Sequence, residues 1–94
     1  MQPVHPGRIL QRELSARDMS AEALASALRT DPAKISDVLS GASGITPETA
    51  LRLGRYFGNS ARFWLNLQSA YELARAEGEL GARIAAEVAP ATAA

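Results

Sequence analysis

The sequence predicts an all-α domain of five helices, of which the last is the longest. Five segments carry apolar residues at the three- and four-residue spacing of one helix face. A residue suited to capping or starting a helix stands before each segment, and glycines follow several of them. The 94 residues are enough for one small domain with a single modest core.

The composition excludes several classes of protein. The sequence has no cysteine, which excludes disulfides and thiolate metal sites, and its single histidine, His5, cannot form a common zinc site. It has no G-x-S-x-G motif and no other catalytic constellation, so we predict neither enzymatic activity nor a cofactor. No apolar run reaches the roughly 20 residues that span a bilayer, and the N-terminal residues lack the apolar core of a signal peptide. We therefore expect a cytoplasmic protein without membrane contact.

The first helix is predicted to begin at Pro6, because proline suits the first helical position and His5 can cap the helix. Leu10 and Leu14 belong to its inward stripe. The polar run Ser15–Met19 is predicted to connect this helix to the next one.

Residues 20–41 are predicted to form two short helices joined by a tight turn. Capping and stop signals mark the helix ends, namely Ser20, Asp31 with Pro32, and Gly41. Only about three residues separate the two helices. This is the helix-turn-helix pattern, in which buried aliphatic residues, here Ile35 and Val38, hold the second helix across the first.

The turn between these two helices carries an unusual residue, because Arg29 occupies a position where glycine is most common. Either Arg29 adopts a left-handed backbone conformation, with strain of about 1 kcal/mol, or the turn has a different shape. On this pattern alone, DNA binding and a purely structural helix pair are equally supported.

The fourth and fifth helices are bounded by the same kinds of signal. A threonine cap followed by proline starts the fourth helix and a glycine ends it, which predicts the range Pro47–Phe57. Ser60 is suited to cap the fifth helix, which is predicted to run to about Glu77. At 1.5 Å per residue this helix is roughly 27 Å long.

A tail is predicted beyond the fifth helix. Gly78 and Gly81 weaken the continuation of the helix, so residues 1–80 are predicted as the folded domain. Residues 81–94 are predicted as an alanine-rich tail that forms at most a short helix and frays from Pro90 on.

The fifth helix has more apolar surface than packing against a small four-helix body requires. One stripe along it consists of Trp64, Leu67, Tyr71 and Ala74. The excess predicts that residues 60–77 form a homodimer contact with a two-fold partner. The alternative is that Phe63 and Trp64 only cap the core of a single chain.

A longer set of motifs runs through residues 3–77. It consists of His5-Pro6-Gly7 with Ile9-Leu10, Ser20 with Leu24-Ala25, Ile35-Ser36 with Gly41, Ile45-Thr46, Ala50 with Arg52-Leu53, Phe57-Gly58, Ser60, Phe63-Trp64-Leu65 with Leu67-Gln68, and Tyr71-Glu72-Leu73. In these positions the chain resembles the HigA family of antitoxins, small helix-turn-helix proteins of the Xre/Cro group with a lambda-repressor-like fold.

The resemblance implies a function that composition does not show. It implies a homodimer that binds double-stranded operator DNA, represses its own operon and neutralises a HigB-like toxin, an mRNA-cleaving ribonuclease. Two alternatives stay open: an orphan regulator of the same group without a toxin, and a helix-turn-helix used only for protein contact. The last is supported by the ten basic and ten acidic residues, which cancel and leave no global basic field.

The candidate DNA-binding residues follow from the helix-turn-helix geometry, in which the second helix lies in the major groove with its N-terminal residues near base edges. Lys34 suits a guanine or a phosphate, and Asp37 either accepts from cytosine or pairs with Lys34 in solvent. Hydroxyls at turn, loop and cap positions suit phosphates. The predicted set is Thr30, Ala33, Lys34, Ser36, Asp37, Ser40, Ser43 and Thr46. An inverted-repeat operator is the predicted target.

Overall fold

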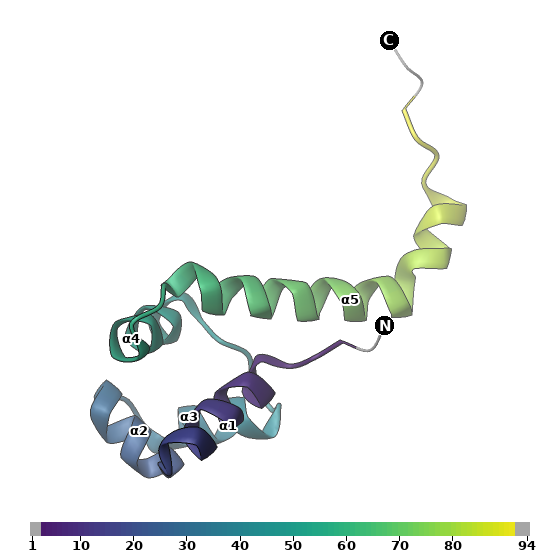
Figure 1. Cartoon of the computed structure of the whole chain (residues 1–94). Coiled ribbons are helices and arrows are strands. Elements are labelled where there is room, and N and C mark those ends of the chain that lie inside the picture. The colour runs from purple at the N-terminus through teal and green to yellow at the C-terminus, as the bar shows by residue number, and fades with distance from the viewer. Residues whose placement is uncertain (1–2, 92–94) are drawn as a thin grey trace.

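The computed structural model describes residues 3–91 and has five helices and no strand in that range, which confirms the all-α prediction. In chain order the helices are α1 (Pro6–Arg17), α2 (Ala21–Leu28), α3 (Pro32–Ser40), α4 (Pro47–Phe57) and α5 (Ala61–Glu87) (Figure 1). Residues 1–2 and the end of the predicted tail, residues 92–94, lie outside the described part.

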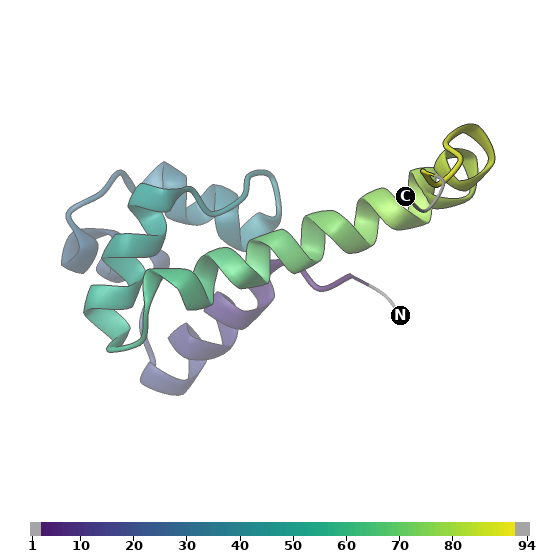
Figure 2. The same ribbon diagram turned by 90° about the horizontal axis from the view of Figure 1, so that it is seen from above.

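The molecule consists of a small helical body and a projecting arm. Helices α1 to α4 and the first turns of α5 form the body, and the rest of α5 extends beyond it in both views (Figures 1 and 2). The principal axes measure 53 × 25 × 22 Å, and the radius of gyration is 16.6 Å. A compact domain of this length has a radius of gyration of about 12 Å. The second half of α5 is therefore not covered by its own domain.

Each helix begins where the sequence predicts. A side-chain atom of the preceding residue accepts a hydrogen bond from a backbone N–H of the first turn, from His5, Ser20, Asp31, Thr46 and Ser60 for the five helices in order. The His5 cap uses Nδ1, which accepts from the Gly7 N–H at 2.9 Å. Gly41 and Gly58 end α3 and α4 with left-handed backbone, at φ 83° and 78°.

One apolar core holds the body together. The buried hydrophobic residues are Leu10, Leu14, Leu24, Ala25, Leu28, Ile35, Val38, Ile45, Ala50, Leu53 and Trp64. Trp64 is the largest of them and is 0% exposed. Its indole Nε1–H donates to Asn59 Oδ1 at 2.8 Å, so the polar atom of the ring is satisfied as well.

Helix α1 is longer than predicted. The connection expected over Ser15–Met19 begins only at Asp18, whose left-handed backbone (φ 54°, ψ 45°) ends the helix. Alanine and arginine favour a helix in the added turn, and Arg17 forms an ion pair with Glu13 at 3.4 Å across four residues. The prediction of a connection is therefore wrong over Ser15, Ala16 and Arg17.

Helix α5 is also longer than predicted, because it ends at Glu87 and not near Glu77. Two ion pairs across four residues support the added turns, Arg75–Glu79 at 3.5 Å and Arg83–Glu87 at 3.2 Å. Figure 1 shows that the ribbon changes direction in the yellow-green part of α5, the region of Gly78 and Gly81, and glycines are a common cause of such kinks. Even at this length α5 is not apolar enough to cross a membrane, and no other helix among residues 3–91 is either.

Helices α1 and α3 meet main chain to main chain at Gly7. Gly7 is buried, and a Cβ atom added there would overlap the carbonyl oxygen of Val38. Any larger residue would force the two helices apart. Backbone contact, and not an interlocking side chain, therefore sets the distance between α1 and α3 at this point.

The turn between α2 and α3 has the left-handed form of the two alternatives, since Arg29 has φ 56° and ψ 48°. We expect Arg29→Gly to raise the free energy of unfolding by up to about 1 kcal/mol, because glycine carries no steric penalty there. The measurement is denaturant unfolding of both proteins. The control is Arg12→Gly inside α1, where the same exchange should cost about 1 kcal/mol. A loss of stability at position 29 would contradict the assigned strain.

Candidate nucleic-acid interface

Helix α3 presents a polar outer face. Ile35 and Val38 are 0% and 2% exposed and anchor α3 to the body. All five residues predicted to face DNA from this helix are exposed, namely Ala33, Lys34, Ser36, Asp37 and Ser40. Helical spacing sets four of them along one strip, with Lys34 at its border. This is the arrangement that base reading in a major groove requires.

Thr30 lies in the turn that leads into α3. Its backbone N–H donates to the Ala25 carbonyl at 3.0 Å, and the Arg29 N–H donates to the Ser26 carbonyl at 3.2 Å. These two hydrogen bonds satisfy carbonyl groups at the end of α2, where Arg29 has left-handed backbone. Asp31 then caps α3 by accepting from the Ala33 N–H at 2.9 Å. The start of α3 is thus fixed by local hydrogen bonds.

A shallow hollow of about 360 Å³ brings together three of the predicted DNA-binding residues, Lys34, Ser43 and Thr46. Thr49 and Glu72 also line it. One ammonium group and three hydroxyl groups in one depression suit a phosphate, whereas the Glu72 carboxylate from α5 opposes one. The other five predicted residues lie outside this hollow, on α3 and in the turn before it.

The charges of α3 are directed to solvent. Within residues 3–91 the four ion pairs join other residues, so the expected alternative of a Lys34–Asp37 pair is not formed. The backbone carbonyl of Asp37 accepts from the N–H groups of Ala42 and Ser43, at 2.9 and 3.1 Å. Both side-chain charges therefore stay available to a ligand.

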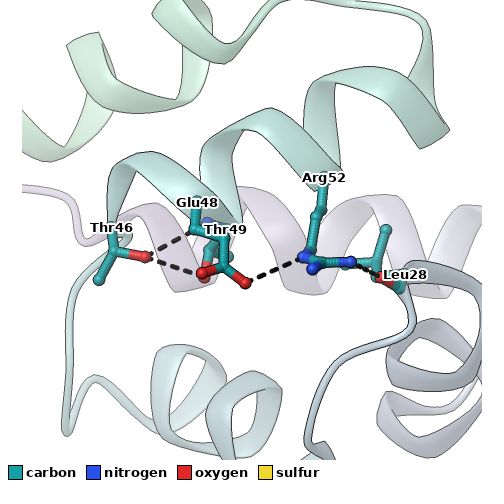
Figure 3. A network of polar contacts seen from close by, with 5 residues as sticks. All are labelled: Leu28, Thr46, Glu48, Thr49 and Arg52. Carbon is teal, nitrogen blue, oxygen red and sulfur yellow. Dashed lines mark hydrogen bonds and ion pairs between the residues drawn. The ribbon is translucent and has the colours of Figure 1, made fainter.

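A polar network that the sequence did not reveal links α4 to the end of α2 (Figure 3). The Thr46 hydroxyl accepts from the Thr49 N–H at 3.2 Å and donates to Thr49 Oγ1 at 3.1 Å. One turn on, Arg52 pairs with Glu48 at 3.2 Å and donates from Nη1 to the Leu28 carbonyl at 2.8 Å. Arg52 thereby neutralises a carboxylate in the first turn of α4 and fixes the carbonyl that precedes the turn.

The residues predicted for dimerisation divide into two groups. Trp64 is fully buried in the core of its own chain, so its side chain offers no surface to a partner. Leu67, Tyr71 and Ala74 are half-buried, and their role in a dimer stays a prediction. Beyond residue 70 the exposed large apolar side chains are a different set, Leu73, Leu80, Ile84 and Val88, which lie on both sides of the change in direction of α5.

Tyr71 has contacts within its own chain. Its ring meets His5 edge to face, with centroids 4.8 Å apart, and its hydroxyl accepts from Arg75 Nη1 at 3.4 Å. The hydrogen bond with Tyr71, and after it the nearby Glu79 carboxylate, raises the pKa of Arg75, which stays charged. Tyr71 therefore supports the cap of α1 whether or not a second copy is present.

Comparison with known proteins points to one group. No family model matches the sequence. The virulence-associated protein I of Dichelobacter nodosus is 50% identical over 78 residues, which cover 82% of this chain and 72% of that protein. The structure of an addiction module antidote protein of a HigA family from Coxiella burnetii is 46% identical, with a TM-score of 0.95 over 97% of this chain and 100% of the other. The structure of Pseudomonas aeruginosa antitoxin HigA with the higBA promoter is also 46% identical, with a TM-score of 0.92 over 95% and 98% of the two chains.

Proposed function

Because the chain belongs to the HigA family of helix-turn-helix antitoxins, we propose that it is a DNA-binding antitoxin that represses its own operon as a homodimer. The observation that carries the proposal is the outer face of α3, which is polar, exposed and anchored from behind by Ile35 and Val38. The Pseudomonas aeruginosa relative whose structure includes a promoter shares this fold. The protein is a binding protein and not an enzyme, and it acts in the cytoplasm, where operator DNA and mRNA lie.

Operator reading depends on α3 and on the hollow beside it. The N-terminal half of α3 enters the major groove, with Asp37 close to a base edge and Lys34 on a guanine or a phosphate. Ser43 and Thr46 bind the adjacent phosphates. One copy offers few positive charges in this region, and affinity scales with the number of neutralised phosphates. Two copies are therefore needed, on half-sites about 34 Å apart.

The dimer forms through the projecting arm. The second half of α5 is uncovered, and Leu73 and Ile84 are 60% and 49% exposed along it. Soluble monomers rarely leave several large apolar side chains on one projecting helix open to water. A two-fold contact between two α5 helices buries these side chains and sets the spacing of the two α3 helices.

The toxin partner is proposed from family membership. A HigB-like mRNA-cleaving toxin binds a surface away from α3, so that operator and toxin are held at the same time. The exposed side of α1 with Arg8 and Arg12 is one such surface. A gene for a small ribonuclease beside the gene for this protein would separate an antitoxin from an orphan regulator.

The test of DNA reading is a titration of Lys34→Ala and Asp37→Ala against the operator and a scrambled duplex at two salt concentrations. Lys34→Ala should weaken binding to the operator and lower the salt slope by about 2, because a dimer loses two phosphate-neutralising charges, one from each copy. Asp37→Ala should change the preferred base at one position, with a discrimination of about 10- to 100-fold.

The control for this titration is Arg62→Ala, which removes an exposed positive charge from α5. It should bind both duplexes as the wild type does. If Lys34→Ala and Asp37→Ala also bind both duplexes like the wild type, α3 is not the reading helix, and a helix-turn-helix for protein contact becomes the better account.

A further inference from the structure

Gln68 stands out because it is the one buried polar side chain among residues 3–91, at 8% exposed. It lies on α5, and both ends of its amide are hydrogen-bonded. Oε1 accepts from the backbone N–H of Ile45 at 2.8 Å, and Nε2 donates to Glu72 Oε1 at 2.9 Å. A buried amide is costly unless it is bonded in this way, so both partners matter to its position.

The segment that Gln68 holds joins α3 to α4. Ser43 and Thr46, two predicted phosphate contacts, flank the Gly44–Ile45 peptide, and the Ile45 side chain is 4% exposed. A Cβ atom on Gly44 would lie 2.6 Å from Gln68 Nε2. With any larger residue at position 44, the amide would have to move away from the loop. The amide lies under the backbone of this loop.

We propose that Gln68 is the positioning residue that ties the DNA-contacting loop to the dimer helix. The inference rests on the proposed function and explains how the loop after α3 is kept in position relative to α5. An operator dimer must keep its two α3 helices at one separation. The hydrogen bond from Ile45 to Gln68 connects α5 directly with the loop that follows α3 in the same chain. Without it the Ile45 N–H loses its buried acceptor, and the loop that carries Ser43 is no longer fixed.

The partner residue Glu72 allows the proposal to be tested without changing the net charge. In the double variant Gln68→Glu with Glu72→Gln, one carboxylate oxygen at position 68 accepts from the Ile45 N–H and the other accepts from the new amide at position 72. Both hydrogen bonds are therefore kept with the polar groups exchanged. In Gln68→Met, which has a similar shape and the same charge as wild type, both bonds are lost.

The experiment measures operator affinity and the hydrogen exchange of the Ile45 amide in the full-length protein. Gln68→Met should bind the operator about tenfold more weakly and exchange the Ile45 amide at least about tenfold faster, while it remains helical and dimeric. Gln68→Glu alone should also bind the operator weakly, since its new carboxylate then faces that of Glu72. The double variant should recover both quantities to within about threefold of wild type. Ser69→Glu, on an exposed neighbouring position, controls for the added charge and should change neither strongly.

Two results would overturn the proposal. One is a folded Gln68→Met protein with wild-type affinity, and the other is a double variant no better than Gln68→Glu. If Gln68→Met does not fold, Gly44→Ala displaces the same amide from the loop side, and wild-type operator affinity in that variant contradicts the role of Gln68. If the wild type itself binds no operator, the proposed function fails, while exchange at Ile45 still reports on the link between α5 and the loop.

Discussion

Replacement of Leu73 by glutamate is expected to make the protein monomeric and to lower its operator affinity by about 10²- to 10⁴-fold. Leu73 is 60% exposed on the uncovered part of α5, so the change leaves the core of the chain intact. In a two-fold contact, each copy brings its new carboxylate into the interface. Both carboxylates lose their water there without gaining a group of opposite charge. A monomer loses the gain from engaging two half-sites at once, for which this range is typical.

Sedimentation and operator titration check this prediction together, with circular dichroism to confirm that the helices persist. The matched control is Leu51→Glu on α4, at a leucine that is 65% exposed but lies on the body. It should remain dimeric and bind normally. A Leu73→Glu protein that is still a dimer would remove this part of α5 from the interface. A monomer with wild-type affinity would show that one copy is enough for operator binding.

Trp64→Ala is expected to lower the free energy of unfolding by about 3–5 kcal/mol, because it removes the largest fully buried side chain and leaves a cavity. The ring centroid of Trp64 lies 5.8 Å from that of Phe57 and 5.2 Å from that of Phe63, so both neighbours lose packing. The hydrogen bond to Asn59 is lost as well. Domains of this kind are stable by about 5–15 kcal/mol in total, so a large fraction of the stability disappears.

Urea unfolding monitored by circular dichroism measures the loss. Phe63→Ala is the control, because it truncates the neighbouring aromatic residue, which is 42% exposed and has less to lose. It should cost clearly less than Trp64→Ala. Equal losses at the two positions would contradict the assignment of Trp64 to the core and of Phe63 to its edge.

The starts of the helices could be predicted because their causes are local. Caps such as Ser20 and Thr46 act on N–H groups within three residues, so sequence spacing alone reveals them. The helix ends at Arg17 and Glu87 depend instead on weak propensities and exposed ion pairs, each worth a few tenths of a kcal/mol. Such small terms do not favour one end point clearly, so the sequence predicts an end that is too early for both helices.

The candidate site could be predicted only in part, for a similar reason. The outward face of α3 follows from helical periodicity, and its five residues are exposed as expected. The hydrogen bonds that hold the site in place follow no helical period. Arg52 bonds to a carbonyl 24 positions away and Gln68 to an N–H 23 positions away, and no local pattern encodes such pairs. An apolar stripe also does not tell whether its partner is the same chain, so the sequence predicts Trp64 as a dimer residue and leaves open the alternative, a cap on the core, that its complete burial supports.

The main-chain contact between Gly7 and Val38 has a consequence for protein engineering. Since α3 is held by its backbone contact with Gly7 and by the buried side chains of Ile35 and Val38, its outward side chains take no part in holding it. Ala33, Ser36 and Asp37 can then be exchanged as a set to retarget the protein to a new operator, with the scaffold unchanged. The choice of operator and the stability of the fold can thus be changed separately in this domain. A library of variants at these three positions would make use of this separation.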